Sequence, residues 1–232
     1  ALFAGMRSAA SHWLLVALLA SRASGDAPTP RWPEAFVSNY TSDWKNTTGL
    51  YAVEVRGAVA RELIVFEDGT RDHLCSTRHN ATSCVMLVAA GYRFHHFPDK
   101  ADCCKCCAYA SGSYLCGGPL SPQWVDNSTG NLVYLGVHDV KGRPCHKWNA
   151  VGLEGDFNYY FQDEGGRPCE VDGYNYLHTP AERADDQYIF DPGTYSEQVR
   201  PELFAVPGIC EAAGYCGPPA CAAGPEEEEG AL

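Results

Sequence analysis

The sequence has 232 residues, including 12 cysteines and 13 tyrosines, and its formal net charge is −12. This length fits one domain of ordinary size better than two very small ones. The excess of acidic residues argues against nucleic acid and anionic membrane as partners.

The first 25 residues have the pattern of a secretory signal. Arg7 precedes an apolar run over residues 13–20, and small residues follow from Ser21 to Gly25. The run is shorter than the roughly 20 residues that cross a bilayer. We therefore expect residues 1–25 to direct export, with no transmembrane segment in the mature chain. The protein is then secreted or resides in the lumen of the secretory or endolysosomal pathway.

Four Asn-x-Ser/Thr triplets support the same compartment. They begin at Asn39, Asn46, Asn80 and Asn127, and none has proline in the middle position. Such triplets are the acceptors of N-glycosylation in exported proteins. We predict that all four asparagines are glycosylated.

Residues 48–210 consist of short runs rich in Val, Tyr, Phe and Leu, separated by Gly, Pro, Asn and Asp. This pattern is typical of antiparallel sheets, here with roughly eight or nine strands. One hairpin is predicted at Asp68-Gly69, because Asp-Gly accepts the positive φ angles of a tight turn. Its strands cover residues 62–67 and 70–75. The other predicted strands cover residues 50–59, 84–89, 92–97, 132–140, 145–151, 157–162 and 168–174. Residues 120–125 resemble a helical turn, and residues 185–193 an extended piece.

The twelve cysteines predict a disulfide framework in an exported chain of this size. They are Cys75, Cys84, Cys103, Cys104, Cys106, Cys107, Cys116, Cys145, Cys169, Cys210, Cys216 and Cys221. A bridge between Cys75 and Cys84 would close a local glycosylated loop. A second local bridge, between Cys216 and Cys221, would precede the acidic tail.

Residues 102–107 read Asp-Cys-Cys-Lys-Cys-Cys. Neighbouring cysteines point in different directions, so the segment can connect one stretch of chain to several strands. Zinc and a catalytic redox pair are the alternatives, because two overlapping Cys-x-x-Cys pairs are present. Four adjacent thiolates cannot face one tetrahedral ion without strain, however. We interpret this segment as a disulfide hub.

Cys145 and Cys169 are predicted not to bond to each other. If residues 153–156 and 164–167 are turns, the two cysteines lie on strands separated by one intervening strand. Their separation is then about 9 to 10 Å, which exceeds the roughly 7 Å between Cα atoms that a disulfide spans. We expect the hub to supply their partners.

No catalytic constellation is recognisable in the sequence. His95 and His96 are adjacent on a predicted strand and should face opposite sides of the sheet. Nucleophile-elbow, metalloprotease and Walker motifs do not occur. The paired carboxylates at 163–164 and 185–186 are typical of solvated loops rather than of a glycosidase. Calcium is the one metal that such acidic loops favour, although no spacing specifies a site. We expect a protein that is not an enzyme and has no resident cofactor.

Alternating apolar residues on three predicted strands indicate a sheet face that has to be covered. Helix-forming sequence is scarce, so the cover is either a second layer of strands, as in a plain sandwich core, or a ligand. With Trp148 added, the candidate ligand-lining residues are Leu63, Val65, Val133, Leu135, Val137, Trp148, Phe157, Tyr159 and Phe161.

The order of short motifs between Trp32 and Cys210 resembles the ependymin-related secreted glycoproteins. The matching motifs are Trp32-Pro33 with Phe36, Asp68-Gly69, Cys-Cys-x-Cys at 103–106, Cys116-Gly117, Pro122-Gln123-Trp124, Cys145-His146-Lys147-Trp148, Tyr159-Tyr160 before Asp163, Pro168, Phe190-Asp191-Pro192, and Phe204-Ala205-Val206-Pro207 with Cys210. This resemblance implies an open, strongly curved antiparallel sheet, similar to bacterial lipoprotein carriers, that holds a hydrophobic ligand and has calcium as a modulator. It implies no catalytic residue. The chain has more cysteines than the animal members, so their disulfide pattern is not transferred.

These observations together predict a mostly β, disulfide-rich fold. We expect a curved antiparallel open barrel or a two-layer sheet with one or two short helices over residues 26–212, followed by a disordered acidic tail at 213–232. The expected function is non-catalytic binding of a hydrophobic small molecule or lipid by a secreted glycoprotein. One alternative is an extracellular or cell-surface interaction or matrix module without a ligand pocket. Another is a secreted hydrolase with an unrecognised site.

Overall fold

The computed structural model describes residues 28–69, 73–76, 78–79, 82–108, 132–151, 157–174 and 186–216. Strands dominate this part of the chain. They are β1 (Ala35–Ser42), β2 (Thr47–Arg56), β3 (Val59–Phe66), β4 (Cys84–Ala89), β5 (Tyr92–Phe97), β6 (Asp102–Ala108), β7 (Leu132–Val140), β8 (Arg143–Val151), β9 (Phe157–Gln162), β10 (Pro168–Tyr174) and β11 (Asp186–Phe190). The helical segments are α1 (His73–Ser76), η2 (Pro98–Lys100), η5 (Pro201–Phe204) and α2 (Gly208–Glu211).

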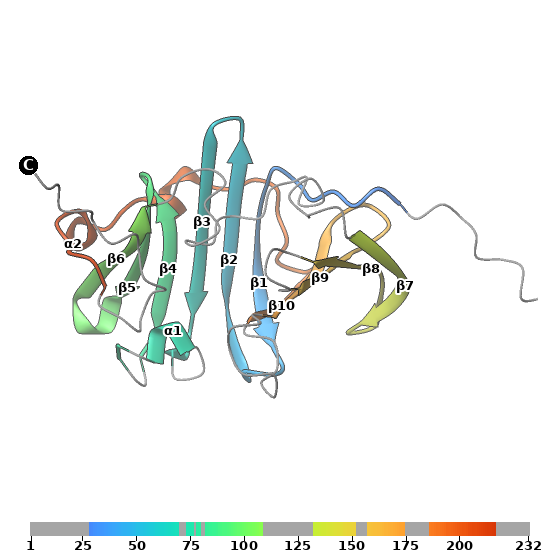
Figure 1. Cartoon of the computed structure of the whole chain (residues 1–232), viewed down its shortest axis with the longest axis horizontal. Helices are drawn as coiled ribbons and strands as arrows, with labels where there is room; N and C mark the ends of the chain where they lie inside the picture. Colours follow the sequence, from blue (N-terminus) through green and yellow to red (C-terminus); the bar gives the residue numbers. More distant parts are fainter. Residues whose placement is uncertain are drawn as a thin grey trace, which may run out of the picture.

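All eleven strands form one antiparallel sheet in the order β6-β5-β4-β3-β2-β1-β11-β10-β9-β8-β7. Each half of this order is a run of consecutive strands, and β1 joins the halves by pairing with both β2 and β11. The β1–β11 ladder is short, with the pairs Tyr40↔Phe190 and Thr41↔Ile189. The sheet is open and curved, with only short helices beside it (Figure 1). The predicted mostly β fold is therefore confirmed, as a curved open sheet.

Five predicted strands have the observed bounds, namely β4, β5, β7, β9 and β10. The predicted hairpin at Asp68-Gly69 is wrong, because β3 pairs with β2 and β4 while α1 follows the turn. The tight turn beside β3 lies at Gly57, where φ is +58°. Gly69 has another role. A Cβ atom there would lie 2.2 Å from the carbonyl oxygen of Thr82, so glycine permits a close approach of two backbones.

The two sides of the sheet carry different side chains. One side, the aromatic face, holds a buried cluster that extends across both halves of the sheet; its largest members are Trp32, Phe36, Tyr40, Tyr51, Phe66, Phe97, Trp148, Tyr160, Tyr188 and Phe190. Trp32, which precedes β1, packs edge-to-face on three of these rings. The other side, the opposite face, carries a second cluster over β2–β6 with Leu63, Leu87 and Phe94, against which Phe204 of the C-terminal segment packs. The two clusters bury β2–β5 from both sides.

The segment at residues 102–107 is a disulfide hub, as predicted. It forms the centre of β6, where Cys103 bonds to Cys210 and Cys104 bonds to Cys216. Cys106 and Cys107 are also disulfide-bonded, to partners outside the described residues. These bonds hold the C-terminal segment against β6, at one edge of the sheet, and cover backbone groups that would otherwise be open to another chain.

Two local disulfides were predicted at the ends of the cysteine pattern, with different outcomes. The bond between Cys75 and Cys84 is confirmed. The predicted bond between Cys216 and Cys221 is wrong, because Cys216 bonds to Cys104. The backbone N–H of Cys216 also donates to Lys105, at 2.8 Å, so the chain runs beside β6 up to this point. Residues 217–232 of the predicted tail, the predicted signal and the helical turn at 120–125 lie outside the described residues.

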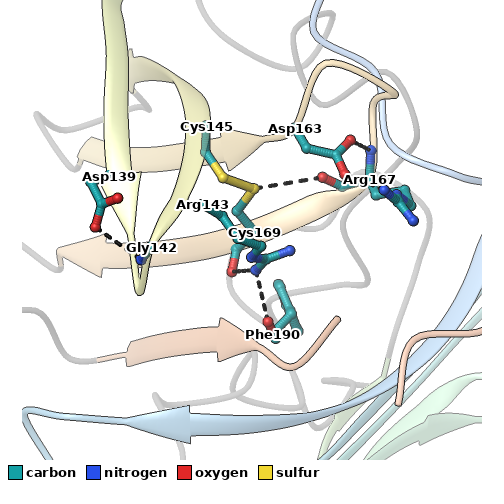
Figure 2. The surroundings of a disulfide bond; sticks show 8 residues. All are labelled: Asp139, Gly142, Arg143, Cys145, Asp163, Arg167, Cys169 and Phe190. Carbon is teal, nitrogen blue, oxygen red and sulfur yellow. Dashed lines mark hydrogen bonds and ion pairs between the residues drawn. A yellow bond between two sulfur atoms is a disulfide. The ribbon is translucent and has the colours of Figure 1, made fainter. Parts of the chain in front are cut away.

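The prediction that Cys145 and Cys169 do not pair is wrong. They form a disulfide with a Cα–Cα separation of 6.6 Å, shown in Figure 2. They do lie on β8 and β10, with β9 between these strands, but β9 ends at Gln162, which pairs with His146 and Pro168. Cys145 lies one residue beyond that end, and the ladder shifts register at Cys169. No strand separates the two sulfur atoms at this level.

We expect removal of this disulfide by the Cys145→Ala/Cys169→Ala pair to lower the free energy of unfolding by about 3 kcal/mol. Both sulfurs are buried, and the bond closes a loop of 24 residues. Urea unfolding measures the change. The matched control is the Cys75→Ala/Cys84→Ala pair, whose loop has 9 residues and whose loss should cost less. An unchanged midpoint for the first pair would contradict the expectation.

Candidate functional site

The structure divides the candidate ligand-lining residues between the two sides of the sheet. Trp148 is on the aromatic face, 2% exposed, between Tyr134 and His146. Leu63, Val65, Tyr159 and Phe161 are on the opposite face, in two separate clusters. Phe157 is part of β9, and its side chain lies outside the described residues. The candidates therefore do not line one common surface.

A β-bulge in β7 determines the faces of the sheet on which the remaining three candidates lie. The β7–β8 register shifts between Tyr134 and Gly136, where Gly136 has a φ of +95°. Val133 consequently pairs with Asn149 and lies on the opposite face, whereas Val137 pairs with His146 and lies on the aromatic face. The expectation that alternation places Val133, Leu135 and Val137 on one face is wrong for this reason.

All three residues are nevertheless exposed on the same strand, Val133 on one side of it and Val137 on the other. Val133, Leu135 and Val137 are 49%, 42% and 57% exposed, on the strand at the second edge of the sheet. Within the described part of the chain, the other exposed large hydrophobic residues are Val59, Ile209 and Tyr215. The half-buried side chain of Tyr134 connects this strand to the aromatic cluster. We call Val133, Tyr134, Leu135 and Val137 the β7 surface.

The aromatic face itself is filled by side chains. Phe36 stacks on Tyr51 and meets Phe190 edge-to-face, with ring centroids 5.5 and 5.4 Å apart. Among the described residues, a small pocket lies near Arg143, Arg167 and Tyr195, and it has room for about one water molecule. Arg143 is anchored there, because its Nη2 donates to the carbonyl oxygens of Cys169 and Phe190 (Figure 2). A ligand of lipid size has no space in this pocket.

A buried polar network on the opposite face was missed by the sequence analysis. Glu170 and Asp172 are 8% and 6% exposed on β10, and Gln187 of β11 donates from Nε2 to Glu170 at 2.8 Å. The Oε1 of Gln187 accepts from the backbone N–H groups of Asp43 and Trp44. The signal was the Glu-x-Asp spacing in β10, which places both carboxyl groups on one face of a strand.

Two oxygen atoms in this region lack a hydrogen-bond partner among the described residues, namely Oδ1 of Asp172 and Oδ1 of Asn149. Burial, followed by the charge and hydrogen bond of Glu170, raises the pKa of Asp172 to about 8. The ammonium group of Lys147 lies 3.9 Å from the ring centroid of Tyr159, whose strand runs between the strands of the two oxygens. A buried unpaired acceptor is costly, so each of these two oxygens favours a donor that the described residues do not supply.

Two adjacent histidines on β5 and a charged cluster around Asp102 are part of the framework of the fold. His95 is fully buried on β5, whereas its neighbour His96 is half-buried on the other side, so the predicted orientation is confirmed. Arg78 donates twice to Asp102, and His79 contacts the same carboxylate at 2.7 Å. The Arg78 hydrogen bonds lower the pKa of Asp102. This cluster anchors the chain before β4 to β6.

Two predicted glycosylation sites are on described residues. Asn39 is exposed on β1, and Asn46 is exposed in the turn between β1 and β2, with a φ of +48°. Both positions leave room for a sugar, and their modification stays a prediction. Asn80 and Asn127 lie outside the described residues. No described helix has the length and apolarity to cross a membrane.

Comparisons with known proteins find similarity in structure only. No protein-family model matches the sequence, and no curated protein sequence does. An uncharacterized conserved protein from Thermus thermophilus gives a TM-score of 0.44 at 8% identity, over 78% of this chain and 90% of that one. A chain of the Pseudomonas aeruginosa MucA/MucB complex gives 0.35 at 12%, over 76% and 56%. A DUF1329 family protein from Desulfovibrio piger gives 0.29 at 13%, over 63% and 66%. Because these TM-scores are below 0.5, function has to be inferred from this chain's own residues.

Proposed function

We propose that the protein is an exported, non-catalytic binding protein that engages a hydrophobic small molecule or lipid at the β7 surface of its curved sheet. The observation that carries this proposal is the exposure of Val133, Leu135 and Val137 on one edge strand. Exposed apolar groups that gather on one element indicate a binding surface more often than scattered ones do. Tyr134 and the buried Trp148 provide a rigid aromatic support beneath it.

Export and family membership belong to the same proposal. Ten described cysteines are all in disulfides, and such density is typical of oxidising compartments. The resemblance to ependymin-related proteins is supported by the order of sequence motifs and by the curved antiparallel sheet that the resemblance implies. Calcium is proposed as a modulator on the basis of that resemblance alone.

The test is a double substitution on the β7 surface. Val133→Asp/Val137→Asp places a charge on each side of the exposed strand and should weaken binding of dodecanol at least about tenfold, equivalent to about 1.4 kcal/mol. Isothermal titration calorimetry of the purified glycoprotein measures the dissociation constant. The far-UV spectrum should stay unchanged, because both side chains are already in contact with water.

Val59→Asp is the matched control, because Val59 is also an exposed valine on a strand, at 44% exposure, in the other half of the sheet. Its dissociation constant should equal that of the unsubstituted protein. Equal weakening by the control, or full binding by the β7 double variant, would remove the β7 surface as the site.

A second function is favoured by the filled aromatic face. Buried rings fill the aromatic face, and the small pocket near Arg143 holds about one water. An extracellular interaction module without a ligand pocket needs only such a packed core and an exposed apolar edge. Native mass spectrometry after mild extraction separates the two, because a carrier retains heterogeneous hydrophobic cargo and a module retains none.

A further inference from the structure

One row of side chains crosses four neighbouring strands on the opposite face, beginning at the β7 surface. Strand register pairs Val133 with Asn149, Asn149 with Tyr159, and Tyr159 with Asp172. Exposure falls along this row, from 49% at Val133, through the half-buried Asn149 and Tyr159, to 6% at Asp172. An apolar, water-accessible end is thus continuous with a polar, buried end.

At the polar end of this row, two acceptor oxygens have no hydrogen-bond donor among the described residues. Oδ1 of Asn149 and Oδ1 of Asp172 are both buried, and neither receives a hydrogen bond from a described residue. They lie on the strands on either side of Tyr159. Glu170 lies two residues before Asp172, on the same side of β10. Its carboxyl group accepts a hydrogen bond from Gln187 and adds further negative character beside Asp172. The missing partner is therefore a group with N–H or O–H donors.

We propose that this row selects the head group of the bound molecule, so that the ligand is an amphiphile whose head donates hydrogen bonds, an amine or an alcohol, rather than a fatty-acid carboxylate. The inference rests on the proposed function, since Val133 contacts the alkyl chain of the ligand in both proposals. An ammonium or hydroxyl group satisfies the oxygens of Asn149 and Asp172. A carboxylate head group would add its own acceptors beside these two oxygens, and all of these acceptors would remain without a donor.

Among the described residues beside this row, Lys147 favours the opposite choice. Its ammonium lies over the rings of Tyr159 and Phe161, at 3.9 and 4.9 Å from their centroids. That position already gives the charge a favourable environment, and Asp172 and Glu170 lie on β10, beside the strand that carries these rings. A carboxylate ligand would have to draw Lys147 away from both.

The experiment compares three probes that share one alkyl chain, namely dodecylammonium, dodecanol and dodecanoate, each titrated into the purified glycoprotein below its aggregation concentration. The amine and the alcohol should bind at least about tenfold more tightly than the carboxylate, equivalent to about 1.4 kcal/mol. Asn149→Leu and Asp172→Leu should each reduce this preference at least about threefold, because each removes one acceptor. Asp172→Asn keeps the shape and an acceptor, so the preference for the amine and the alcohol over the carboxylate should persist.

Asn158→Leu is the matched control. Asn158 is half-buried on β9 next to Tyr159, but it faces the aromatic side of the sheet, so the preference should persist. Equal affinity for all three probes, or tightest binding of dodecanoate, would overturn the head-group inference and leave the β7 surface intact. Absence of binding by every probe would overturn both proposals together.

Discussion

Replacement of Trp148 by alanine should lower the free energy of unfolding by about 3 to 5 kcal/mol, the usual cost of removing a large aromatic side chain from a core. The sequence placed Trp148 among the ligand-lining candidates, but its side chain is 2% exposed within the aromatic cluster. Substitution of a residue that lines an open site would instead weaken ligand binding and leave the free energy of unfolding nearly unchanged. Guanidinium unfolding of the disulfide-intact protein measures the change.

Two substitutions control for this result. Trp148→Phe keeps an aromatic ring in the same position and should cost clearly less than alanine. Tyr134→Ala removes the adjacent ring, which is only half-buried, and should also cost less. A loss below about 1 kcal/mol for Trp148→Ala, together with abolished dodecanol binding, would show that Trp148 is a binding residue and not a core residue.

Stability should fall as pH rises from about 4 to about 8, by up to about 1.4 kcal/mol for each pH unit. The reason is Asp172, whose ordinary pKa of 3.8 is raised to about 8 by burial and by the neighbouring Glu170. In this interval the folded chain keeps a proton that the unfolded chain has released, so each step toward higher pH favours unfolding. Lys147 opposes the effect and Gln187 moderates it. Urea midpoints at about pH 4.5, 6 and 8 measure the slope.

Asp172→Asn should flatten that slope and stabilise the protein at about pH 8, because the amide has the shape of the carboxyl group and no charge to bury. Asp102→Asn is the informative control. The pKa of Asp102 is lowered by Arg78 and His79, so its contribution is present above the ordinary value and is lost only as pH falls further. Its loss should therefore leave the slope between about pH 4 and 8 unchanged. A slope that persists in Asp172→Asn would contradict the assignment.

Strands with apolar alternation and clear turns could be predicted from the sequence, whereas strands interrupted by polar residues or rich in cysteine could not. β4 and β5 have Val, Leu, Tyr and Phe at alternating positions around a tight turn. β1 contains Ser38 and Asn39 and was not predicted, although it is central in the sheet. β6 is rich in cysteine, a residue whose disulfides rather than its strand preference determine its position. Each is held in the sheet mainly by its neighbour in sequence, β2 for β1 and β5 for β6, and this pairing overrides local preference.

The candidate site shows the same division. Alternation identified Val133 and Val137 as apolar strand residues, but only the bulge at Gly136 decides which face each occupies. Spacing alone placed Cys145 and Cys169 two strands apart in the sheet. The end of β9 at Gln162 was predicted, but the register that places Cys145 and Cys169 beyond this end, within bonding distance, was not. The polar row on the opposite face depends on the register of four strands at once.

The short β1–β11 ladder has a consequence for the nascent chain. β1 is synthesised early, and its neighbour β2 follows at once, but its other neighbour β11 comes from residues 186–190. Until those residues emerge, the strand that becomes the middle of the sheet has an open edge, which is the part of a half-made protein most prone to wrong partners. That edge lies at Tyr40 and Thr41, and the two halves of the molecule join only after β11 has been made.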